Sequence, residues 1–214
     1  MNGFLGNKPA RAGLSDDHAK LSGVAVGIVT NNQDPQQLGR VKVRFPWLPG
    51  EDESFWAMIA VPMAGHERGT YFLPEVDDQV LVAFEHGDIR RPYVLGALWH
   101  RAAPPPETNA DGKNNKRLIR SRSGLQIELD DTDGQEKLTI SDRDGQYRVT
   151  LNPPEKLLTI ESAGDLKLKA KEKVTIEGKE ITLTSTSKTT VKASAALSLE
   201  GSTTKVKGQP INLN

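Results

Sequence analysis

KVTIEGKEITLTSTSKTTVKASAALSLEG, the stretch from Lys173 to Gly201, has no aromatic residue and is rich in threonine, serine and lysine. Its apolar residues recur as pairs whose two members stand two positions apart: Val174/Ile176, Ile181/Leu183, Val191/Ala193 and Leu197/Leu199. Because side chains alternate between the two sides of an extended chain, both members of a pair point the same way. The stretch therefore predicts short β segments that each present one apolar side.

The same pattern begins before this stretch and continues after it. Apolar pairs start at Leu158, Leu166, Val174, Ile181, Val191, Leu197 and Ile211. Most successive pairs start about seven to ten residues apart, and glycine, lysine or serine separates them. Repetition at this length is typical of a winding β structure in which each turn rests on its neighbours.

A single chain with two apolar residues per turn cannot enclose a core. Burial of one leucine or isoleucine contributes about 1.5–3 kcal/mol, whereas ordering a turn costs on the order of 1.5 kcal/mol per residue. Three chains wound about one axis would add their pairs at each level and close all the strand hydrogen bonds. We therefore predict an intertwined trimeric β-helix, a triangular prism, over residues 158–214. Its predicted trimer core consists of Leu166, Leu168, Val174, Ile176, Ile181, Leu183, Val191, Leu197 and Leu199.

This segment has two other interpretations. Its serine, threonine and lysine content also occurs in disordered chains, but disorder does not explain apolar pairs that keep one phase over fifty residues. A lone amphipathic sheet explains the pairs but leaves its edges and apolar face exposed. The intertwined trimer is favoured over both.

Composition excludes several other classes of protein. The 214 residues include 28 basic and 28 acidic side chains and no cysteine. Zero net charge removes the simplest argument for a nucleic-acid or anionic-membrane binder. Without cysteine there is neither a disulfide framework nor a thiolate metal site. No apolar run approaches the roughly 18 residues of a membrane helix, and the first twenty residues lack the apolar stretch of a secretory signal. We expect assembly in the cytoplasm.

Aromatic residues divide the chain into two differently built parts. Ten of the eleven lie before His100, and only Tyr147 follows. Short strand-like runs rich in valine, isoleucine and aromatic residues fill residues 21–100, with little helical periodicity. They predict an OB-like closed barrel, in an all-β protein. Residues 101–117 form a predicted proline- and asparagine-rich linker, and alternating runs with Asp-Gly and Pro-Pro turns predict a β-meander neck over residues 118–157.

The barrel segment resembles a known family. The matching features are Gly39-Arg40-Val41-Lys42-Val43, Trp56 to Pro62, Phe72-Leu73-Pro74-Glu75, Asp78-Gln79-Val80-Leu81-Val82, and Gly87-Asp88 followed by Pro92 and Gly96. Together they are similar to the OB domain of the phage baseplate assembly protein V family, which also occurs in type VI secretion spikes and related contractile injection machines.

The resemblance implies a structural central spike that links a baseplate hub to a tip and pierces a target envelope on contraction. It implies an OB collar followed by a trimeric β-helical needle, with no enzymatic activity and no cofactor, as a component of a phage tail or tail-like particle. A separate hub protein would receive the collar, helped by the leader (residues 1–20). A PAAR-type tip protein would cover the end of the needle, and the membrane would be a transient partner. The predicted tip contacts are Ile211, Asn212, Leu213 and Asn214.

Some relatives of this kind hold an iron ion through a His-x-His pair near the needle end. The four histidines of this chain, His18, His66, His86 and His100, lie outside the needle, so no metal site is expected.

Candidate chemistry in the barrel has simpler structural explanations. Glu75, Asp77 and Asp78 are interpreted as an acidic turn rather than a metal or acid/base cluster. The segments Gly65–Gly69 and Glu85–Asp88 contain histidine and carboxylates but no third orienting group, so no catalytic residue is assigned. A cell-wall hydrolase would need such a group.

An OB-fold oligonucleotide or glycan binder is the alternative function. Arg40, Lys42 and Arg44 alternate with apolar residues and could form a basic stripe along one strand face. The acidic loop from Glu51 to Glu53 lies close in sequence and would oppose nucleic acid. We therefore predict no nucleic-acid partner.

Overall fold

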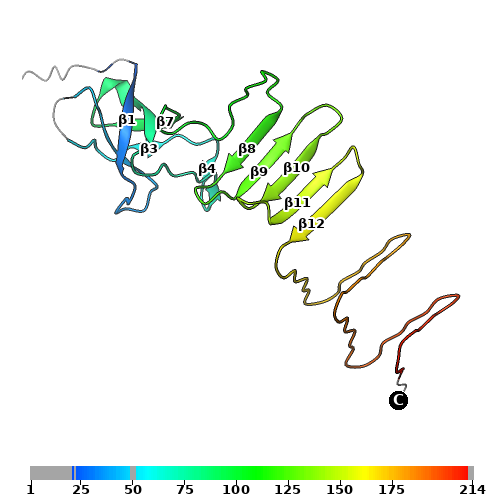
Figure 1. The fold of residues 1–214 in the computed structure, drawn as a ribbon. Coiled ribbons are helices and arrows are strands. Elements are labelled where there is room, and N and C mark those ends of the chain that lie inside the picture. Colours follow the sequence, from blue (N-terminus) through cyan, green and yellow to red (C-terminus); the bar gives the residue numbers. More distant parts are fainter. Residues whose placement is uncertain (1–20, 22, 49–51, 212–214) are drawn as a thin grey trace, which may run out of the picture. The chain divides into compact units, whose positions relative to one another are not determined.

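A computed structural model describes residues 21, 23–48 and 52–211, and they form an all-β protein (Figure 1). The described residues contain no α-helix, and one turn of 3-10 helix, η1(Glu85–Gly87), is their only helical element. None of the described residues belongs to a helix long and apolar enough to cross a membrane. The chain divides into two units, Met1–Ala163 and Gly164–Asn214. The predicted all-β class is confirmed.

The first part of unit one is a small barrel. Its strands are β1(Val24–Asn31), β2(Lys42–Arg44), β3(Met58–Ile59), β6(Gln79–Phe84) and β7(Pro92–Leu98). They form a sheet in the order β2-β1-β6-β7-β3, antiparallel except for the parallel pair β3/β7. Val41 and Ala57 exchange two backbone hydrogen bonds of 3.1 and 2.7 Å, which join the two ends of the sheet. This topology agrees with the predicted OB fold.

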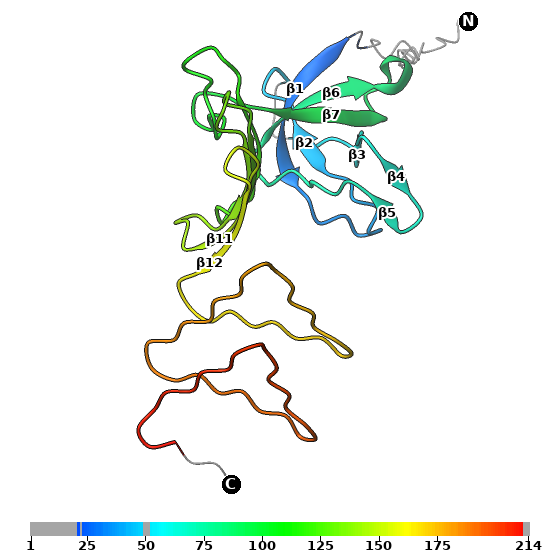
Figure 2. The same cartoon turned by 90° about the vertical axis from the view of Figure 1, so that its right-hand side faces the viewer.

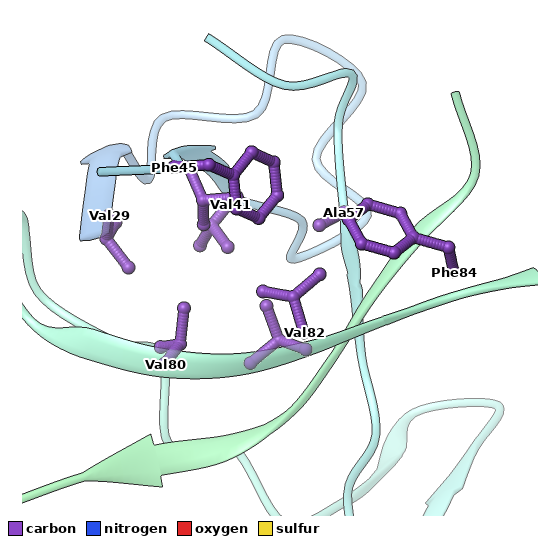
Figure 3. Close-up of a cluster of buried hydrophobic side chains, with 9 residues drawn as sticks. Val29, Val41, Phe45, Ala57, Val80, Val82 and Phe84 are labelled. Carbon is purple, nitrogen blue, oxygen red and sulfur yellow. The ribbon is translucent and has the colours of Figure 1, made fainter. Parts of the chain in front are cut away.

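Valine dominates the barrel core. The strands are rich in valine, and strand alternation points every second residue inward. The buried cluster comprises Val29, Val41, Val43, Phe45, Ala57, Val80, Val82, Phe84 and Val94. Figure 3 shows the labelled members pointing toward one another from strands that are far apart in sequence. Along β6 the side chains of Val80, Val82 and Phe84 are buried, whereas Leu81 and Ala83 are half-buried on the outer side. Every second residue of this strand therefore faces the core.

Unit one also contains a hairpin, between β3 and β6 in the sequence, and a long meander after β7. The hairpin consists of β4(Ala64–Gly65) and β5(Arg68–Gly69). The meander consists of β8(Lys116–Arg120), β9(Gln126–Asp130), β10(Lys137–Ser141), β11(Tyr147–Asn152) and β12(Leu157–Ser162), each antiparallel to the next. The predicted neck ended at residue 157, but Leu158 and Ile160 belong to β12, because they pair with Leu151 and Val149 of β11. The meander thus includes the first apolar pair that the sequence placed in the needle.

Unit two, described as far as Ile211, differs from unit one because it contains no strand. Figure 2 shows its chain running in successive wide loops of similar outline, one after another. No strand is present between residues 164 and 211, and no two backbone groups of residues 166–211 are hydrogen-bonded to each other. Every residue of this range is exposed. A single chain therefore satisfies none of the backbone pairing that a β structure requires in this segment.

Candidate functional site

The meander carries a continuous apolar row across all five strands. The pairing register joins Ile119, Ile127, Ile140, Val149 and Ile160 side by side. A second, parallel row on the same face joins Leu129, Leu138, Leu151 and Leu158. The side chains of the first row are 37% to 54% exposed in the single chain. We call the two rows the meander face.

The opposite face of the meander is polar and better covered. Glu128, Thr139, Thr150 and Thr159 follow one another across it, and all four are half-buried. Asp130 is buried on this face, where its carboxylate accepts hydrogen bonds from the amide and the hydroxyl of Thr132. These hydrogen bonds lower the pKa of Asp130. The apolar side of this sheet is thus the more exposed one among the described residues.

The predicted trimer-core residues of unit two are also exposed apolar side chains. Their side chains are between 54% and 80% exposed, and Ile211 is 47% exposed. The described chain folds none of them into a buried cluster, since all members of the buried core belong to the barrel. Of the predicted tip contacts, Asn212, Leu213 and Asn214 lie outside the described residues.

The outer face of the barrel sheet is a further apolar surface. Val26 of β1 pairs with Leu81 of β6, and Val24 pairs with Ala83. Val24, Val26 and the nearby Leu95 of β7 are exposed. This is the outer apolar face that the alternation of β6 predicts, and nothing in the described chain covers it.

The acidic turn has a structural geometry. The Asp78 carboxylate accepts a hydrogen bond of 2.9 Å from the Glu75 amide, and Asp77 adopts a positive φ of 76°. Glu75 Oε1 lies 3.0 Å from Nη1 of Arg122. The described residues contain no group of three or more side chains arranged to hold a metal ion. The Asp78 hydrogen bond and the positive φ of Asp77 belong to a tight turn, and the Glu75 carboxylate is ion-paired with Arg122.

The two histidine-containing segments are separate turns. His66 and Glu67 form the tip of the β4–β5 hairpin. His86 lies within η1 and has a φ of 52°. Beside it, hydrogen bonds from Arg91 and Tyr93 lower the pKa of Glu85, and those from Arg90 lower the pKa of Asp88 to about 2. Glu85 and Asp88 are thus each paired with neighbouring residues of their own turn region.

The basic stripe is largely neutralised within the barrel. Arg40 forms an ion pair of 2.8 Å with Asp34, and Lys42 forms one of 2.9 Å with Glu53. Both cations also lie against the ring of Trp56, at 5.8 and 5.6 Å from its centroid. Two of the three charges on the stripe therefore have acidic partners, which weakens its fit to a phosphate backbone.

Asp34 organises the loop before β2, a role that the sequence did not reveal. Its carboxylate accepts hydrogen bonds from the amides of Gln36 and Leu38 and from two guanidinium nitrogens of Arg40. The Asp34 side chain is only 3% exposed. The hydrogen bonds from Arg40 hold the pKa of the Asp34 carboxyl well below its usual range. In the sequence, only the turn-forming residues Asp-Pro and Leu-Gly-Arg at the two ends of this loop pointed to a turn here.

The barrel is similar to a domain found in known proteins. Residues 25–99 match the family described as the type VI secretion system/phage-baseplate injector OB domain. The match spans the barrel strands from β1 to β7, so the barrel is similar to this OB domain along almost its whole length. The injector OB domain fits the closed topology and the inward valines described above, and the resemblance stated from the sequence is confirmed.

Relatives extend the similarity beyond the injector OB domain. A type VI secretion system spike protein of Vibrio cholerae, VgrG3, is 29% identical over 118 residues, which is 53% of this chain and 11% of that protein. The spike protein VgrG1a of Pseudomonas aeruginosa is 29% identical over 127 residues, 54% of this chain and 20% of that protein. The actin cross-linking toxin VgrG1 of V. cholerae is 27% identical over 118 residues, 53% of this chain and 10% of that protein. The chain thus aligns with a fifth or less of each relative.

The Asp34 loop gives a testable pH dependence for the injector OB domain. Because the folded-state pKa of Asp34 is depressed, its contribution to stability is full above the unfolded pKa of about 3.9 and disappears as pH falls below it. We expect Asp34→Asn to lower the melting temperature of the barrel by about 5–10 °C at pH 7.

Thermal unfolding from pH 7 down to pH 2 checks this expectation. The difference in melting temperature between Asp34→Asn and the unaltered chain should shrink as the solution is acidified. A difference that stays constant over the whole range would contradict the assigned role of the carboxylate.

Proposed function

We propose that the chain is the structural central spike of a contractile phage tail or tail-like injection system, working as a homotrimer. The observation that carries this proposal is the state of residues 166–211. Their backbone groups are not bonded to one another, and their apolar pairs are exposed, although the pairs recur in one phase. The similarity of the barrel to injector OB domains supports the same conclusion.

Chains that wind together would remove both deficits at once. Strands from neighbouring chains would complete the backbone hydrogen bonds of each loop. The apolar pairs of three chains would meet on one axis and become buried, while the threonine, serine and lysine side chains stay in water. The meander face would pack against the same faces of the two other chains.

The proposed role is mechanical. Residues 21–100 would form the collar, joined through residues 101–117 to the neck and the needle. A hub protein would receive the collar together with the leader, and a PAAR-type tip protein would cover the end near Ile211. The stiffness of the needle would come from continuous strand pairing, so that contraction concentrates force on a small area of the target envelope. Assembly would take place in the cytoplasm, and no step requires bond-making chemistry.

Cysteine trapping tests the proposal, because the chain has no cysteine of its own. Leu197→Cys should place three thiols at one level of the trimer axis. A tris-maleimide reagent should then convert most of the protein into a covalent trimer, as seen by denaturing electrophoresis. Ser198→Cys is the matched control, since its thiol should point outward and leave the chains separate. Equal trapping of both variants would refute the proposed inward phase.

A further inference from the structure

Charge is divided unequally between the two units of the chain. The whole sequence is neutral, but residues 164–214 contain nine lysines and five acidic residues, a net charge of +4. The remainder of the chain therefore carries −4. Opposite charge in two halves of a chain points to a charged partner for one of them. In the proposed homotrimer, on which this inference rests, the positive charge is tripled along the needle.

Four of the nine lysines form a regular row. Lys167, Lys169, Lys171 and Lys173 occupy alternate positions in the sequence, and the chain bends at Lys171 and Glu172. Alternation puts Lys167 and Lys169 on the side opposite the predicted core residue Leu168, at spacings of about 6.6 Å. All four lysines are exposed, and in the described chain their ammonium groups have no hydrogen bond or ion pair. We call this set the lysine row.

We propose that the lysine row binds the anionic phosphate headgroups of a lipid bilayer. A lysine is a point charge on a flexible stem, which suits a surface of many phosphates without fixed geometry. Each lysine near such a surface adds to the attraction. Three copies of the row around a trimer would present cations on every side of the needle.

The composition of unit two favours lipid over nucleic acid. Residues 164–214 contain neither an aromatic residue nor an arginine. Binding of single-stranded nucleic acid relies on aromatic platforms for base stacking, and base-specific contacts rely strongly on arginine. A surface whose only cations are lysines supplies charge attraction without base recognition. The row therefore suits a headgroup layer.

Vesicle co-sedimentation of the full chain tests this proposal. Vesicles of phosphatidylcholine alone are compared with vesicles that contain 30% phosphatidylglycerol, a proportion of about one anionic lipid in three. We expect at least about tenfold stronger partitioning to the anionic vesicles, falling steeply as salt is raised. Equal partitioning to both kinds of vesicle would overturn the proposal.

Two matched variants separate the row from net charge. Replacement of all four lysines of the row by glutamine should lower partitioning at least about tenfold. The control replaces Arg101, Lys113, Arg143 and Lys156, four exposed basic residues of unit one, by glutamine. The control should retain binding to within about twofold, since those charges lie outside the needle. Equal losses in both variants, or tighter binding of a single-stranded oligonucleotide than of the anionic vesicles, would contradict the assignment to the lysine row.

The native mass of each variant is measured alongside. A trimeric variant that loses vesicle binding supports the lysine row. If the unaltered chain is a trimer but does not bind anionic vesicles, the lipid proposal is overturned and the spike proposal stands. If the unaltered chain is a monomer, the spike proposal itself is overturned.

Discussion

Ile181→Asp is expected to prevent trimer assembly while the barrel remains folded. Ile181 is 54% exposed in the single chain, so a charge there is harmless before assembly. In the trimer three carboxylates would meet at one level of an apolar axis, far from counterions. Each buried ion costs several kcal/mol, and like charges at close range add to that cost. The free energy of association should therefore fall by at least about 6 kcal/mol per trimer.

The neighbouring residue supplies the control for this prediction. Thr182 points to the other side of the extended chain, so Thr182→Asp should leave the mass of the assembly unchanged. Analytical ultracentrifugation of both variants across a range of concentrations measures the difference. Similar dissociation of the two variants would show that the assigned phase of the apolar pairs is wrong.

Val82→Asp is expected to unfold the barrel. Val82 is 0% exposed and lies within the buried cluster of β1, β2, β6 and β7. A carboxylate at this position has no partner among the apolar side chains around it and must be buried as a charge or held protonated. We expect the free energy of unfolding to fall by about 4 kcal/mol or more, which is a large part of the total stability of a small domain.

Leu81→Asp is the matched control for the barrel. Leu81 is the next residue of β6 and faces the outer side, half-buried. Its replacement should leave the tryptophan fluorescence and near-UV circular dichroism of the barrel close to those of the unaltered chain. Equal loss of these signals in both variants would contradict the inward phase of β6.

Local pattern was sufficient to predict the barrel and the turns of the meander. The alternation of Val80, Val82 and Phe84 indicates which side of β6 faces the core. This inference needs only the sequence of the strand itself. The Asp-Gly turns were likewise visible, and Gly134 and Gly145 adopt φ values of 70° and 68° there, which glycine accommodates without strain.

Features that depend on pairing between distant segments could not be predicted in the same way. The single apolar row from Ile119 to Ile160 exists only because five strands share one register, which separate strand patterns do not specify. The end of the meander was placed too early for the same reason, since β12 is defined by its bonds to β11. The Asp34 loop depends on side-chain hydrogen bonds that turn propensity alone does not reveal.

The absolute mass of the purified, intact chain in dilute buffer tests the central claim most directly. Light scattering coupled to size-exclusion chromatography should give about 70 kDa, three times the 23.4 kDa of one chain. That mass should persist at low micromolar concentration, as expected of chains whose apolar residues are buried only against one another. A folded species of 23.4 kDa with protected amides in residues 166–211 would contradict the account.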